Sequence, residues 1–222
     1  GISAFAVNGD SGALTPVAGS PFELSHAQPL PNGAVTAIYQ PLIRPDGKVG
    51  YISVLPSDKV YGAGMDPATG VLSEIGGMPQ FVGMLVGSMT FGDSGNRLYV
   101  PHNSVNPMLP NSGGAVELFE VAAGGTLTHV GGWPTNGTNP TVARLNADGS
   151  VLVVAHGTSG TVASFKVDTG AGTLTPAPGS PYSTGNAANA VTHVIPHPTR
   201  DFVFATNSNG NGASSIAAWT VD

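Results

Sequence analysis

The sequence predicts an all-β fold built from repeated four-stranded antiparallel sheets. Three observations support this prediction: one short pattern recurs along the chain, apolar residues alternate in short runs, and turn residues separate these runs. The chain has 222 residues, including 32 glycines and 19 prolines, and only 9% of its residues are charged. This composition is typical of short strands joined by many tight turns.

The recurring pattern is a strand and turn centred on a leucine. Its leucines are Leu14, Leu72, Leu127 and Leu174, at intervals of 58, 55 and 47 residues. The copies read SGALTPVAGSPF from Ser11, TGVLSEIGGMPQF from Thr69, GGTLTHVGGWP from Gly124 and AGTLTPAPGSPY from Ala171. A period of this length indicates a repeat architecture in which each unit is one small sheet.

A strand with alternating apolar positions precedes each copy. These strands read ISAFAV from Ile2, VYGAGM from Val60, VELFEV from Val116 and VASFKV from Val162, and a fifth, IAAWTV from Ile216, ends the chain. Alternation over six residues is the pattern of a strand with one buried face.

Two further strands, joined by a polar turn, lie between these units. They read LIRPDGKVGYISV, MTFGDSGNRLYV, ARLNADGSVLVV and VIPHPTRDFVFA. Asp-Gly and Gly-Asn favour hairpins because positive φ costs little there. Each repeat thus supplies four strands, named A (innermost) to D (the leucine strand), which predicts a β-propeller blade. A β-sandwich with a chance repeat is the alternative.

The pattern also predicts the arrangement of these strands. We expect the innermost strands at Val35 to Ile43, Leu85 to Phe91, Thr141 to Leu145 and Val191 to Ile195. The chain should form one propeller domain or part of one, with repeats at 1–57, 58–104, 105–159 and 160–214 and a terminal strand at 215–222. Because a C strand stands at both ends, we expect no closed ring of four blades.

Composition excludes several classes of function. The net charge of -6 leaves no basic surface for nucleic acid, and the absence of cysteine removes disulfides, thiolate catalysis and Cys-ligated metals. No apolar run is long enough to span a membrane. A surface rich in Gly, Ser, Thr, Asn and Pro favours an extracellular or periplasmic location.

The strand C pattern with the Leu-Thr-Pro line and the PDG hairpin resembles the lactonase-type seven-bladed propellers, which include bacterial 6-phosphogluconolactonase and fungal carboxymuconate-lactonizing enzyme. The resemblance covers essentially the whole chain. It implies about four blades of a ring of seven, since seven would need a considerably longer chain. The shared residues are turns and core, so they are specific for fold and weak for function.

Polar residues follow the B strands on the face where the D-to-A and B-to-C loops meet. His102 and His156 occupy matching positions there, Asn103 follows the first of them, and Asn207 stands at the same point in the last repeat. With His193 they would line a pocket for a small anion or carbonyl compound. The alternative is that each histidine only caps a loop, and the spacing supports no metal site.

The resemblance implies one catalytic histidine. Phosphogluconolactonase-like propellers carry Gly-Pro-Arg-His, where this chain reads Ala190 to His193, so His193 is kept and the arginine is Thr192. A second family histidine falls near Gly87 and is absent. Arg144, on an inner strand, is the arginine expected to point into the channel. Because Thr192 replaces the arginine, we expect no turnover of 6-phosphogluconolactone.

These observations favour a lactonase-like propeller acting as an extracytoplasmic binding or scaffold protein. The first alternative is a lactone hydrolase or lactonizing isomerase for a sugar or aromatic lactone, with His193 as acid-base and Arg144 as anion partner. The second is a structural subunit of an extracellular assembly. We expect no cofactor, and partners that bind the loop face or the terminal strand edges: a small molecule, another protein or a second copy.

Overall fold

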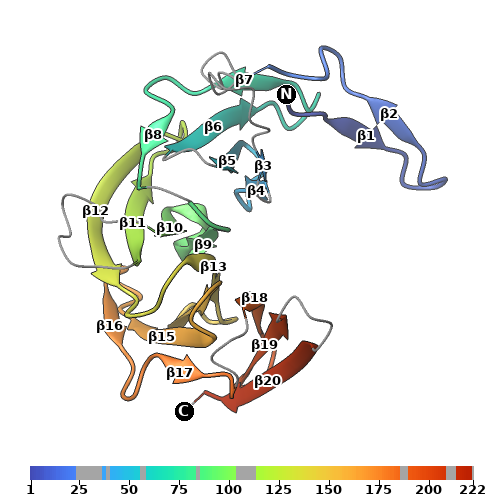
Figure 1. The fold of residues 1–222 in the computed structure, drawn as a ribbon. Coiled ribbons are helices and arrows are strands. Elements are labelled where there is room, and N and C mark those ends of the chain that lie inside the picture. Colours follow the sequence, from blue (N-terminus) through green and yellow to red (C-terminus); the bar gives the residue numbers. More distant parts are fainter. Residues whose placement is uncertain are drawn as a thin grey trace, which may run out of the picture.

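The computed structural model describes residues 1–23, 37–38, 41–55, 59–83, 86–103, 114–185, 190–208 and 214–221. Its strands form five separate antiparallel sheets arranged along an open arc (Figure 1). The first sheet is a hairpin of β1 (Phe5–Val7) and β2 (Leu14–Pro16), here called the N-terminal hairpin. The other four are called blades 1 to 4.

The strands of each blade follow one another in sequence. Blade 1 contains β3 (Ala37–Ile38), β4 (Leu42–Ile43), β5 (Val49–Leu55), β6 (Lys59–Met65), β7 (Leu72–Glu74) and β8 (Gln80–Phe81). Blade 2 contains β9 (Thr90–Gly92), the 3-10 helix η1 (Asp93–Gly95), β10 (Arg97–His102), β11 (Ala115–Val121) and β12 (Leu127–Pro134). Blade 3 contains β13 (Pro140–Leu145), β14 (Val151–His156), β15 (Thr161–Val167), β16 (Leu174–Pro176) and β17 (Tyr182–Ser183). Blade 4 contains β18 (Ala190–Pro196), β19 (Phe202–Ser208) and β20 (Ser214–Thr220).

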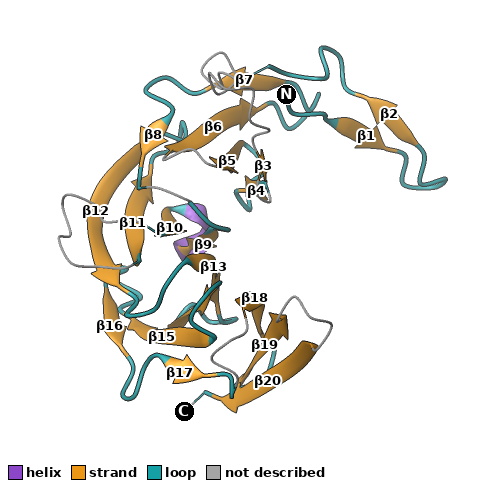
Figure 2. Ribbon diagram, viewed as in Figure 1, coloured by secondary structure: helices purple, strands orange, loops and turns teal. Residues whose placement is uncertain are grey.

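Each blade is an up-and-down meander, as Figure 2 shows by its strands and short connecting turns. In blade 1, β3 and β4 both pair with β5, and β7 and β8 both pair with β6, so each interrupted pair fills one of the four strand positions. The glycines that the sequence places in hairpin turns, such as Gly47 and Gly149, have positive φ. The predicted propeller is confirmed: blades 1 to 3 fill four strand positions and blade 4 fills three among the described residues. The β-sandwich is excluded.

Three layers of the core lie between successive blades, and a smaller cluster of Ile52 and Tyr61 of blade 1 packs against Ile2. Val49 and Tyr51 of blade 1 meet Leu98 and Phe119 of blade 2 in the first layer. The second layer joins blades 2 and 3, and the third joins blades 3 and 4. Because both faces of a middle blade are covered, β10 and β14 are buried almost continuously.

The inner edge of the arc consists of β3 with β4, β9, β13 and β18, as the strand pattern predicts (Figure 1). Residues 35–36, 39–40 and 85 of the predicted inner strands lie outside the described residues. The N-terminal hairpin and blade 4 lie at opposite ends of the arc, so the described strands do not close a four-blade ring. The predicted repeats begin at C strands, whereas each blade of the structure begins at an A strand. The predicted repeat boundaries therefore do not coincide with the blades, and they stay a prediction.

Candidate functional site

The two residues predicted to be catalytic lie on neighbouring inner strands. Arg144 of β13 pairs with Val153, and the equivalent pair in blade 4 is Ile195 and Phe204. His193 comes two residues before Ile195, which places it about 7 Å nearer the loop face. Strand β13 packs against β18. The fold thus brings an arginine and an imidazole to adjacent strands of the inner edge.

The guanidinium of Arg144 is held by acceptors from two blades. Its Nη1 donates to the carbonyl oxygens of Ala143 (2.7 Å) and Met89 (3.2 Å), and its Nη2 donates to Ser88 Oγ (3.0 Å). Burial lowers the pKa of Arg144 below its ordinary value, but a guanidinium still carries its charge near neutral pH. The result is a half-buried, oriented cation beside the inner edge.

His193 is exposed and follows a β-bulge at Thr192. The β18–β19 register shifts between Val191 and His193, and His193 pairs with Thr206. The Thr192 and Thr206 hydroxyls lie 2.8 Å apart, and Thr192 Oγ1 also donates to the Thr206 carbonyl. Where the resemblance implies an arginine, this chain therefore places a hydroxyl that is bonded within its own blade.

The close packing at Gly87, near which the resemblance implies a second histidine, leaves no room for a side chain. A Cβ at this position would lie 2.4 Å from the carbonyl oxygen of Thr141. The two inner strands approach this closely because Ser88 N donates to Thr141 O and Ala143 N donates to Ser88 O. No L side chain fits without moving the strands apart.

The histidines at the ends of the B strands are buried. Equivalent positions in blades 2, 3 and 4 are held by His102, His156 and Asn207. His102 pairs with Ala115 and Asn207 pairs with Ser215 on the neighbouring strand, and His156 contacts Thr161 there. The exposed fractions of His102 and His156 are 0% and that of Asn207 is 2%. Burial lowers the pKa of His156 to about 4, so this imidazole is neutral at physiological pH.

The fold therefore distributes the predicted pocket residues rather than gathering them. His102, His156 and Asn207 lie in three different blades, and His193 lies apart from them on an inner strand. Asn103 Oδ1 accepts the backbone N–H of Asn139 (2.9 Å), which ties the loop after β10 to the loop before β13. Their ligand-binding role stays a prediction.

Sequence reasoning missed two residues of interest. Ser88, 7% exposed, orients Arg144 from the neighbouring blade. Glu117, 1% exposed, lies between two imidazoles in blade 2. Strand alternation indicates that one of Glu117 and Glu120 faces solvent, and the structure shows it is Glu120. The sequence pattern gives no indication of which residues contact the buried carboxylate of Glu117.

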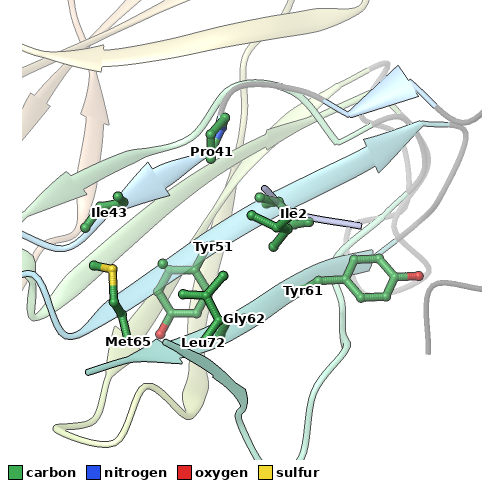
Figure 3. Close-up of a pocket in the computed structure, with 11 residues that line it drawn as sticks. Ile2, Pro41, Ile43, Tyr51, Tyr61, Gly62, Met65 and Leu72 are labelled. Carbon is green, nitrogen blue, oxygen red and sulfur yellow. The ribbon is translucent and has the colours of Figure 1, made fainter. Parts of the chain in front are cut away.

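An apolar pocket lies on blade 1, away from Arg144. Its cavity volume is about 70 Å³, and it lies between Ile2 and the sheet residues Ile43, Tyr51, Tyr61, Met65 and Leu72 (Figure 3). Among the described residues, no histidine, carboxylate or basic side chain lines it. Within the part of the chain that the structure describes, no group of three or more His, Asp or Glu residues could hold a metal ion, and no helix is long and apolar enough to cross a membrane.

The comparisons with known proteins agree with this fold. Residues 86–191 match the family model described as "Lactonase, 7-bladed beta-propeller". The match includes Arg144 and ends two residues before His193. The resemblance to the lactonase-type propellers is therefore confirmed. No curated protein matches the chain.

Several solved structures share the fold. A periplasmic gluconolactonase of Pseudomonas aeruginosa has a TM-score of 0.74 at 20% identity, covering 99% of this chain and 59% of its own. A protein from Lactobacillus plantarum has a TM-score of 0.70 at 23% identity, covering 96% and 59%. A putative 6-phosphogluconolactonase from Bacteroides fragilis has a TM-score of 0.65 at 19% identity, covering 99% and 65%. The chain thus spans less than two thirds of these relatives.

Proposed function

We propose that this propeller hydrolyses a sugar lactone at its inner edge, with His193 as acid-base and Arg144 as the anion partner. The observation that carries the proposal is the pair of adjacent inner strands, β13 and β18, that hold an oriented guanidinium and an exposed imidazole. The lactonase family model and the gluconolactonase among the structural neighbours support this role over scaffolding.

The chemistry uses groups that the chain supplies. A neutral imidazole of His193 takes a proton from water as the water oxygen attacks the lactone carbonyl carbon. The proton then passes to the ring oxygen as the carbon–oxygen bond breaks, and the product is a hydroxy acid. The guanidinium of Arg144 stabilises the negative charge that develops on the carbonyl oxygen and that the product carboxylate keeps.

A binding or scaffold role is the second candidate, and one observation favours it. Blade 4 exposes large apolar side chains on the face turned away from blade 3: Phe202 and Phe204 are 42% and 38% exposed, and Ile216 is 73% exposed. Such a face is suited to a protein partner or a second copy. This second candidate includes a location outside the cytoplasm, which one structural neighbour, a periplasmic gluconolactonase, supports. It also includes a protein partner or a second copy of the chain.

The test is a comparison of two substrates with the purified full-length protein. We expect hydrolysis of gluconolactone above the spontaneous rate and none of 6-phosphogluconolactone, because Thr192 stands where the related propellers have arginine. Lack of hydrolysis of either lactone would remove the enzyme proposal and leave the binding role.

A further inference from the structure

A cavity of about 450 Å³, here called the edge cavity, lies between the outer parts of blades 3 and 4. Its volume is within the range typical of binding pockets. Blade 3 contributes Ser164 and Tyr182 to its wall, and blade 4 contributes Trp219 and Val221 at the end of β20. Among the described residues, no charged side chain lines it. The edge cavity is therefore suited to an apolar group.

Leucines fill the equivalent places in the two preceding interfaces. The leucine strand of blade 2 sets Leu127 opposite Val121, and that of blade 3 sets Leu174 opposite Val167. Leu127 is 9% exposed and belongs to the core layer that blade 2 shares with blade 1. Leu174 is 4% exposed and belongs to the layer between blades 2 and 3. Each leucine strand thus inserts an apolar side chain between its own blade and the preceding one.

Val221 holds the place of Val167 in blade 4. The Val221 N–H donates to the carbonyl oxygen of Asp201, as the Val167 N–H donates to that of Ser150. Among the described strands, β20 pairs only with β19, so no leucine strand lies opposite Val221. Trp219 and Val221 pack against the third core layer and are only partly buried. The edge cavity therefore occupies the place that a leucine takes in the other interfaces.

The outer edge of β20, at the end of the arc, is suited to pair with a further strand (Figure 1). Successive N–H groups of a strand point to opposite sides, so the Thr220 N–H, next to that of Val221, points away from β19. In blade 3 the equivalent residue, Lys166, pairs with Thr175 of β16. Lysine, proline and bulges protect many sheet edges from other chains. Strand β20 has no charged residue or proline, and its register with β19 is uninterrupted.

We propose that β20 accepts an extended peptide strand from another polypeptide, and that a leucine of this peptide enters the edge cavity opposite Val221. Backbone hydrogen bonds to the edge of β20 supply the affinity, and the uncharged cavity selects the leucine. The leucine strands of the chain itself show a sequence that fits such a place, with Leu-Thr at its centre. The site lies apart from Arg144 and His193, so the inference does not depend on the lactone chemistry.

The test is binding of a labelled synthetic peptide, SGALTPVAGSPF (residues 11–22), to the full chain by fluorescence anisotropy. We expect saturable binding, and binding at least about tenfold weaker for the same peptide with Leu14→Asp. In a Trp133→Phe background Trp219 is the single tryptophan. Its emission should shift to shorter wavelengths with the first peptide, because the leucine displaces water from the indole.

Two protein variants test the role of the strand edge. Thr220→Pro removes the outward N–H but no hydrogen bond to β19, and should weaken peptide binding roughly tenfold. Thr220→Val keeps the N–H and should bind as wild type does. If Thr220→Pro does not fold, the two peptides still decide on the wild-type chain.

Three results would overturn the proposal. The first is no saturable binding of the peptide, and the second is equal binding of the leucine and aspartate peptides. The third is a stable dimer that excludes the peptide, which would assign the edge of β20 to a second copy of the chain.

Discussion

The hydroxyl of Tyr99 donates a hydrogen bond of 2.8 Å to the carbonyl oxygen of Gly172, in the turn between β15 and β16 of the next blade. Tyr51 makes the same bond one blade earlier, to the carbonyl oxygen of Gly125. Each tyrosine is buried, and burial raises its pKa. Successive blades are therefore joined by directed bonds as well as by apolar packing.

Removing one of these bonds should destabilise the protein. Tyr99→Phe keeps the ring and leaves the Gly172 carbonyl without the hydroxyl, at a cost of about 1 kcal/mol. For a chain of this size that lowers Tm by roughly 2–4 °C in thermal unfolding. The matched control is Tyr182→Phe, which removes an exposed hydroxyl bonded to Pro178 in its own blade. Equal Tm values for the two variants would argue against the inter-blade bond.

The close approach at Gly87 predicts that this position accepts no side chain. Gly87→Ala places a Cβ 2.4 Å from the Thr141 carbonyl oxygen, so the inner strands of blades 2 and 3 must separate. A loss of roughly 1–3 kcal/mol is expected in denaturant unfolding. Gly76→Ala is the control, since nothing lies within 4 Å of its added Cβ. If Gly87→Ala were as stable as Gly76→Ala, the close approach of Gly87 to the Thr141 carbonyl oxygen would be contradicted.

Acid should weaken the contact between Arg44 and Asp46. The Arg44 guanidinium bonds to both Asp46 oxygens, at 2.9 and 2.7 Å, and holds the pKa of Asp46 at about 2. Because the folded pKa is depressed, the stabilisation is complete above the ordinary carboxyl value and is lost as the pH falls towards 2. Arg44 also donates to the Ala122 and Ala123 carbonyls of blade 2, so the pair supports the inter-blade contact.

The matching measurement is urea unfolding of wild type and Asp46→Asn at several pH values. Asp46→Asn should be less stable than wild type near neutral pH, and the difference should shrink steadily as the pH falls from about 4 through 2. Asp10→Asn is a suitable control, since Asp10 is an exposed turn residue. A difference that stays constant down to pH 2 would show that ionisation of Asp46 is not responsible.

The orientation of Arg144 by Ser88 leads to a kinetic prediction that rests on the proposed function. Ser88→Ala removes one hydrogen-bond acceptor of Nη2 and weakens the orientation of the guanidinium, so KM for the lactone should rise several-fold. Ser88→Thr keeps a hydroxyl and should restore most of the affinity. If both variants raise KM equally, the effect comes from packing and not from the hydroxyl.

The strands could be predicted from sequence because their signals are local. Alternating apolar residues, the recurring leucines and the polar hairpin turns indicate the strands, and the order of strands follows from the repeat. The inner position of Arg144 could be predicted for the same reason, since its strand precedes a polar hairpin.

The surroundings of the site residues could not be predicted. The sequence places His102 and His156 in polar loops just after their strands, whereas the structure makes them the buried last residues of β10 and β14. The contact between Glu117 and His129 depends on a one-residue shift in the β11–β12 register, which reverses the face of His129 and leaves no mark in the period of the sequence. Ser88 meets Arg144 across a contact between blades, which no single repeat encodes.

The proposed lactone chemistry is tested most directly by kcat/KM for gluconolactone in His193→Ala beside His197→Ala. Both substitutions remove an imidazole near β18, but His197 lies at the opposite end, where Nδ1 accepts the Thr199 N–H. Loss of the acid-base group should lower kcat/KM by about 10²–10⁴-fold in His193→Ala, whereas His197→Ala should remain close to wild type. Equal activity of both variants with wild type would contradict the proposed role of His193.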